Sequence, residues 1–88
     1  GMAGALHGEV TTTDPSGAAV TMVFQTGEVT ATVPGTSVTV KSTDDFTQTY
    51  TIGAVYPVAE PPAVGSRVWV LATKDGLSLT RLGVVGRG

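Results

Sequence analysis

Alternation of apolar and polar residues is the feature that most constrains the fold of this chain. Val29, Ala31 and Val33 occupy every second position and are separated by threonines, and the same period of two recurs over 37–41 and 46–52. No stretch of ten or more residues has the apolar spacing of a helix. A period of two places successive side chains on opposite faces of a strand. The sequence therefore predicts an all-β chain with little or no helix.

Turn-forming residues divide these alternating segments into short strands. The tetrapeptide 14–17 (Asp-Pro-Ser-Gly) has the composition of a type I turn, and the Pro-Gly pair at 34–35 has that of a type II turn. The Asp-Gly pair at 75–76 indicates a two-residue hairpin turn. Thr26-Gly27 marks a bend or bulge between two strands. The expected strands are 5–13, 18–25, 28–33, 37–42, 46–52, 66–74 and 77–85.

The parity of the apolar faces limits the length of the loop after the third of these strands. A three-residue loop of 34–36 would pair Val33 with Ser37 and would mix apolar and polar side chains on one face. Loops of two or four residues keep the faces separate, so an even loop is expected. At the next hairpin we expect a three-residue loop whose last residue, Asp45, adopts the left-handed conformation.

The length of 88 residues allows a single domain, 1–88. Segment 53–65 contains three prolines, which lack the backbone donor of a central strand, and is expected to cross one end of the sheet as a loop. Charged residues make up only 14% of the chain, so its strand edges carry little charge to protect them. Closure into a barrel would hide those edges. The expected fold is a small barrel or a compact sandwich of five to seven antiparallel strands.

The C-terminal hairpin has two apolar faces. With a two-residue turn, one face carries the inner valines, and the other carries Arg67, Trp69, Leu71, Leu82 and Val84. A hairpin covered on one side only would have one polar face. The second face is therefore expected to be covered by the barrel, by the proline-rich loop or by a partner. We take four of these residues as the candidate partner or ligand surface: Arg67, Trp69, Leu71 and Leu82.

The residues that usually carry chemistry are scarce. His7 is the only histidine and cysteine is absent, which excludes a cysteine-ligated zinc site. The adjacent pair Asp44 and Asp45 lacks the ligand spacing of a calcium loop and indicates a turn. No serine or threonine has a partner that would activate it as a nucleophile. We therefore expect no catalytic residues, no cofactor and no metal site, and we expect that the chain is not an enzyme.

Charge and hydropathy narrow the possible partners. The net charge is −2, which disfavours nucleic acid as a partner. No apolar run of about 18 residues is present, so no transmembrane segment is expected. The chain shows no signal peptide, but Gly1 before Met2 has the form of a scar left by a cleaved expression tag, so a signal peptide could have been removed.

Six segments, taken in order and spacing, carry a family resemblance: 5–10 (ALHGEV), 27–31 (GEVTA), 37–42 (SVTVKS), 49–52 (TYTI), 64–70 (VGSRVWV) and 73–76 (TKDG). With these segments the chain resembles a family of small secreted bacterial β domains of unknown function, which are OB-like barrels of actinobacterial exported proteins. The resemblance implies an OB-like barrel and an extracellular or cell-envelope location. It implies no activity and no functional residues.

The leading hypothesis is a non-enzymatic structural or protein-interaction module of an exported bacterial protein, which acts on a protein partner or by self-association. The alternative is an OB-like barrel that binds an oligosaccharide or single-stranded nucleic acid, because Arg67 and Trp69 lie two residues apart, as in a stacking site. A third reading is an enzyme fragment completed by another chain, which predicts a cleft with several titratable groups of perturbed pKa.

Overall fold

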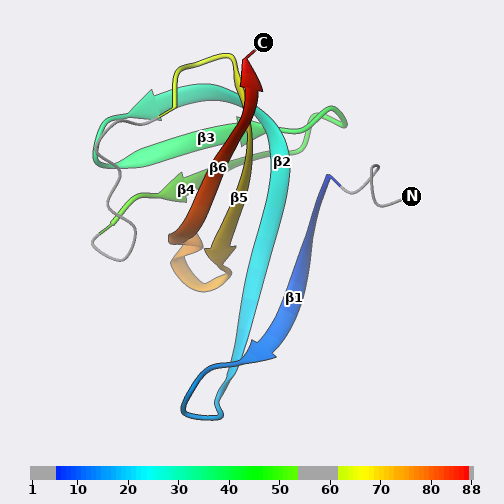
Figure 1. Cartoon of the computed structure of the whole chain (residues 1–88), viewed down its shortest axis with the longest axis vertical. Coiled ribbons are helices and arrows are strands. Elements are labelled where there is room, and N and C mark those ends of the chain that lie inside the picture. Colours follow the sequence, from blue (N-terminus) through cyan, green and yellow to red (C-terminus); the bar gives the residue numbers. More distant parts are fainter. Residues whose placement is uncertain (1–5, 54–61, 88) are drawn as a thin grey trace.

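The structure is a computed structural model that describes residues 6–53 and 62–87, and these residues form one antiparallel sheet of six strands (Figure 1). A 3₁₀ turn at Asp75–Leu77 is the one helical element in this part of the chain. The two-residue hairpin turn expected at 75–76 was therefore wrong, because the amide of Thr73 donates to the carbonyl of Ser78 across a longer connection. The strands run in the order β4-β3-β2-β5-β6, and β1 pairs with β2 beside this path. The all-β prediction is confirmed. The strands are β1 (His7–Thr13), β2 (Ala19–Val33), β3 (Ser37–Lys41), β4 (Thr47–Thr51), β5 (Ser66–Thr73) and β6 (Leu79–Arg87).

Strand β2 organises the sheet because it is long enough to pair with three neighbours. Its first half pairs with β1, its middle with β5 and its last third with β3, and Figure 1 shows it as a curved ribbon across the molecule. The two strands expected at 18–25 and 28–33 are therefore one strand. Thr26 and Gly27 bend β2 without interrupting it, since the missing side chain of Gly27 lets the carbonyl group of Lys41 approach closely.

The register between β2 and β3 differs from the expected one. Val33 pairs with Ser37, so the three-residue loop 34–36 that parity argued against is the loop that forms. A β-bulge at Thr30 explains the difference, because one extra residue in β2 reverses the facing of the residues that follow it. Val29 is fully buried, whereas Val33 is 52% exposed. The parity argument was wrong because it assumed unbroken alternation.

The backbone conformations expected from the turn residues at 14–17, 34–35 and 43–45 are confirmed. Asp45 ends the loop between β3 and β4 with φ +72°, which is the left-handed conformation expected there. The amide of Gly17 donates to the carbonyl of Asp14 at 2.8 Å, as in a β-turn. Gly35 has φ +71°, which is the conformation that a type II turn demands at its third position.

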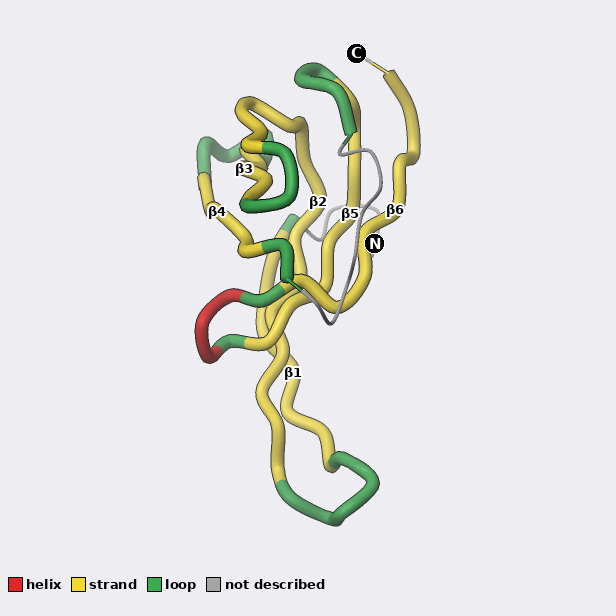
Figure 2. Tube along the Cα trace, turned by 90° about the vertical axis from the view of Figure 1, so that its left-hand side faces the viewer, coloured by secondary structure: helices red, strands yellow, loops and turns green. Residues whose placement is uncertain are grey.

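The core lies on the concave side of the curved sheet (Figure 2). The two edges of this sheet, β4 and the start of β6, meet at one point. A parallel bridge joins Thr51, at the end of β4, to Ser78, which precedes β6. Figure 2 shows the curvature edge-on, and it also shows the β1–β2 hairpin projecting beyond the other strands. Most of the expected crossing loop 53–65 lies outside the described residues. The buried apolar side chains are Val29, Val38, Val40, Tyr50, Ile52, Val68, Val70, Ala72 and Leu79.

Candidate functional site

Three of the four candidate surface residues share one face of β5. Arg67, Trp69 and Leu71 alternate with the buried Val68 and Val70, so they lie on the side of the sheet away from the core. Trp69 is 39% exposed and Leu71 is partly buried. These three residues therefore share one face, and their role as a partner or ligand surface stays a prediction.

The fourth candidate, Leu82, lies on the opposite side of the sheet. It pairs with Val70 and packs against the core, while Trp69 pairs with Gly83. The cause is a second bulge at Thr80, which shifts the register of β6 by one residue after Leu79. Val84, which pairs with Val68, moves to the other side for the same reason. The sequence contains no composition signal for this bulge, so the expected facing was wrong.

The apolar face of β5 continues onto β2 and β1. Directly paired residues of antiparallel strands project to the same side, so Phe24 lies beside Leu71, and Val10 lies beside Met22. Sequence reasoning missed the contribution of β2, although apolar residues occupy alternate positions there. We call this surface the outer face and define it by Val10, Val20, Met22, Phe24, Trp69 and Leu71.

Two aromatic rings of the outer face contact glycines of the neighbouring strand. A Cβ atom on Gly83 would lie 2.5 Å from Cε2 of Trp69, and one on Gly8 would lie 2.9 Å from Cε1 of Phe24. Each ring therefore covers the gap that the missing side chain leaves.

Replacing Gly83 is expected to lift the indole of Trp69 off the sheet. Gly83→Ala should destabilise the domain by about 1–3 kcal/mol through overpacking, and the emission of Trp69 should move to longer wavelength. Gly86→Ala is the matched control, because a Cβ there meets only Cδ of Arg67 at 4.0 Å. Urea unfolding followed by fluorescence measures both effects. Equal stability of the two variants would show that Trp69 does not rest on Gly83.

Charges of both signs border the outer face. In the strand register, Arg67 of β5 lies opposite Glu28 of β2, and Arg81 of β6 lies opposite Leu71 of β5. Neither arginine forms an ion pair with any residue in the described part of the chain. The rim can therefore form ion pairs with a partner surface that also carries both signs.

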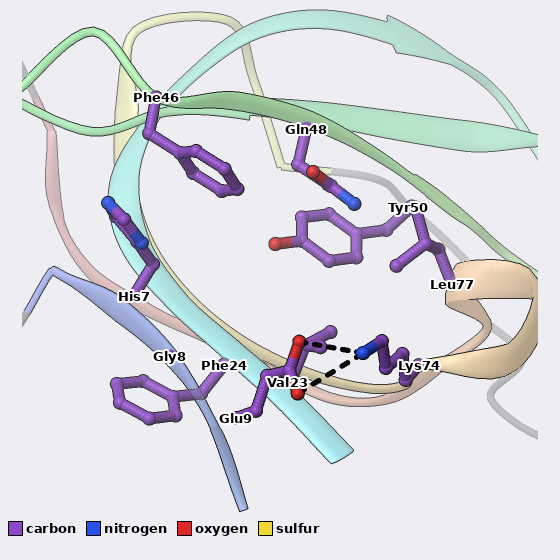
Figure 3. Close-up of a pocket in the computed structure, with 10 residues that line it drawn as sticks. All are labelled: His7, Gly8, Glu9, Val23, Phe24, Phe46, Gln48, Tyr50, Lys74 and Leu77. Carbon is purple, nitrogen blue, oxygen red and sulfur yellow. Dashed lines mark hydrogen bonds and ion pairs between the residues drawn. The ribbon is translucent and has the colours of Figure 1, made fainter. Parts of the chain in front are cut away.

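A cleft of about 420 Å³ opens on the other side of β2, toward the core (Figure 3). It lies between the first residues of β1, the inner side of β2, strand β4 and the turn that follows β5. Sequence reasoning missed this cleft because the bend of β2 creates it. The residues that line it are His7, Gly8, Glu9, Val23, Phe24, Phe46, Gln48, Tyr50, Lys74 and Leu77.

A buried polar network supports the cleft from below. The hydroxyl of Tyr50 donates to Oε1 of Gln25 at 2.6 Å, and Nε2 of Gln25 donates to Oγ of Ser42 and to the carbonyl of Val40 at 3.0 Å each. Burial raises the pKa of Tyr50 to about 12, so its phenol is neutral near pH 7. Every buried side-chain polar atom in the described residues has a partner. The network therefore stabilises the fold and holds the phenol proton of Tyr50 in a hydrogen bond to Gln25.

His7 fastens the start of β1 to the loop between β3 and β4. Its ring stacks on Phe46 with the ring centres 4.0 Å apart, and its Nε2 lies 2.8 Å from Oδ2 of Asp44. Hydrogen bonds from His7 and from the amide of Phe46 lower the pKa of Asp44 below its ordinary value. These contacts give the one histidine of the chain a structural role.

Acid is expected to weaken the His7–Asp44 contact. Because the pKa of Asp44 is lowered in the folded state, the carboxylate contributes stability above its unfolded pKa, and this contribution is lost as the pH falls through the folded value. Wild type should therefore be more stable than Asp44→Asn at about pH 6 and should lose that advantage near about pH 2. Thermal unfolding measures the difference, with Asp75→Asn as control. A difference that persists in acid would contradict the assignment.

No protein-family model, curated protein or solved structure was found that matches the chain. The resemblance to secreted bacterial barrels therefore stays a prediction. Within residues 6–53 and 62–87, no three histidine, aspartate or glutamate side chains gather as metal ligands. The same part of the chain has no helix long and apolar enough to cross a membrane.

Proposed function

We propose that this chain is a non-enzymatic structural or protein-interaction module that docks through its outer face. The observation that carries the proposal is the continuity of this apolar surface across three strands, from Val10 on β1 through Phe24 on β2 to Trp69 on β5. Val10 is 45% exposed and Trp69 is 39% exposed, and contiguous apolar patches on a protein surface often mark sites of protein contact.

A second copy of the chain is the partner that the outer face fits best. Apolar sheet faces pack on one another in sandwiches, and the outer face places apolar residues of three paired strands on one side of the sheet. In a two-fold dimer the same patch meets itself, so its charges must be complementary to their own copies. Glu28 and Arg67 supply charges of both signs at the rim. The proposal is therefore a homodimer formed face to face.

The proposal includes an OB-like barrel as the scaffold and export as its context. The OB fold is a five-stranded, partly open barrel, and the path β4-β3-β2-β5-β6 with its bridge between Thr51 and Ser78 supports that scaffold. Threonine-rich strands with few charges, together with the family resemblance, support an exported bacterial protein.

The emission of the single tryptophan tests this proposal, because Trp69 lies in the outer face. Dilution should separate the copies, expose the indole and shift its emission to longer wavelength. Leu71→Asp should give the emission of the diluted state at every concentration, because it places a charge in the contact. Val33→Asp is the control, since Val33 is exposed outside the outer face. An emission that is independent of concentration in all three proteins would contradict the proposal.

A further inference from the structure

The cleft has the dimensions of a ligand site and opens on the inner side of β2, and Phe24 is the residue of the outer face that also borders it. Its volume of about 420 Å³ lies within the range of about 300–1,000 Å³ that is typical of small-molecule pockets. Val23 and Leu77 pack against the core and Tyr50 belongs to it, so the base of the cleft is apolar. A space of this kind accommodates one ring of a ligand.

The charged groups at the cleft already neutralise one another. Nζ of Lys74 lies 3.1 Å from one carboxylate oxygen of Glu9 and 3.3 Å from the other, and this ion pair spans the cleft in Figure 3. Nε2 of His7 is engaged in a hydrogen bond with Asp44. A charged ligand would have to break one of these pairs to gain a counter-charge. The cleft therefore favours a neutral ligand.

Gln48 is a polar residue of the cleft whose carboxamide lacks a hydrogen-bond partner among the described residues. Figure 3 shows this carboxamide directed toward the ring of Tyr50. A carboxamide offers a carbonyl acceptor and an amino donor side by side. The wall beside it is aromatic, because Phe46 and His7 stack there. The matching ligand presents adjacent donors and acceptors at its edge and an apolar face to the wall.

We propose that this cleft binds a neutral sugar ring of an oligosaccharide. A pyranose carries hydroxyls at its edge, each a donor and an acceptor for Gln48, and its C–H face packs on an aromatic ring. A nucleotide fits less well, because its phosphate needs a cation and Lys74 is held by Glu9. The site goes beyond the proposed docking function and uses the opposite side of β2.

Titration of the ¹⁵N-labelled protein with three neutral trisaccharides, maltotriose, cellotriose and N,N′,N″-triacetylchitotriose, tests this proposal. At least one of them should shift the amide resonances of 46–50 and 74–77. Gln48→Ala should weaken that binding about fivefold or more, the loss of one or two hydrogen bonds. Gln48 has no partner in the described fold, so this variant should stay folded. Trp69→Glu, on the outer face, is the matched control and should bind like wild type.

Three results would overturn the assignment. One is the absence of any shift at about 20 mM of each sugar. The second is binding that Gln48→Ala leaves unchanged, because the ring would then bind elsewhere. The third is an oligothymidylate that shifts the cleft resonances where no neutral sugar does. Each result can be separated from a failure of the dimer proposal, because Trp69→Glu removes the dimer contact and keeps the cleft.

Discussion

Gly27→Ala is expected to destabilise the domain by about 3 kcal/mol or more, the largest effect expected among Gly→Ala changes in the described residues. A Cβ at this position would lie 2.7 Å from the carbonyl carbon of Lys41 and 3.0 Å from the amide nitrogen of Ser42. Both neighbours are backbone atoms, so no side-chain rotation relieves the overlap. The strands can separate only by breaking the pairing of Glu28 with Lys41.

The matched control for this variant is Gly53→Ala. A Cβ on Gly53 meets nothing within 4 Å, so that change should be nearly neutral. Urea unfolding of the three proteins gives the comparison. If Gly27→Ala and Gly53→Ala lost the same stability, the close approach of β3 to the bend of β2 would be contradicted.

Gln25→Leu is expected to cost about 3 kcal/mol although it replaces a buried polar side chain by an apolar one of similar size. Gln25 is fully buried, and its carboxamide accepts from Tyr50 and donates to Val40 and Ser42. Leucine would leave the hydroxyl of Tyr50 in the core without an acceptor. A buried donor without an acceptor loses its hydration and gains nothing in return.

A double-mutant cycle with Tyr50→Phe separates this effect from simple packing. Tyr50→Phe alone should cost about 1–2 kcal/mol, because it orphans Oε1 of Gln25. The double variant should be more stable than the sum of the two losses predicts, since neither orphan remains. Chemical denaturation of the four proteins measures the coupling. Additive losses would show that the hydrogen bond between Tyr50 and Gln25 contributes nothing to the stability.

The strands were predictable from the sequence because a period of two needs only local information. The register was less predictable, because each bulge reverses the facing of every residue after it. Thr30 and Thr80 look like ordinary strand residues, yet each is the extra residue of a bulge. The bulge at Thr30 permits the three-residue loop that parity argued against. The bulge at Thr80 moves Leu82 to the core side of the sheet.

For the candidate surface, the residues within one strand could be predicted, but the residues that a neighbouring strand adds could not. Trp69 and Leu71 share a face because they alternate within one strand, which the sequence shows directly. Phe24 joins them only through the pairing of β2 with β5, which brings together residues about 45 positions apart. Predicting the cleft would require still more long-range information, because the cleft forms only when the bend at Gly27 has placed β1 opposite β4. Long-range pairing of this kind has no local signature in a single sequence.

The solution mass of the domain tests the docking proposal most directly. Light scattering over a range of concentrations should give twice the mass of one chain for wild type and for the exposed control Val33→Glu. Trp69→Glu and Leu71→Glu should each give the mass of one chain while keeping a cooperative unfolding transition. A wild-type protein that has the mass of one chain at every concentration would contradict the proposal that the outer face joins two copies.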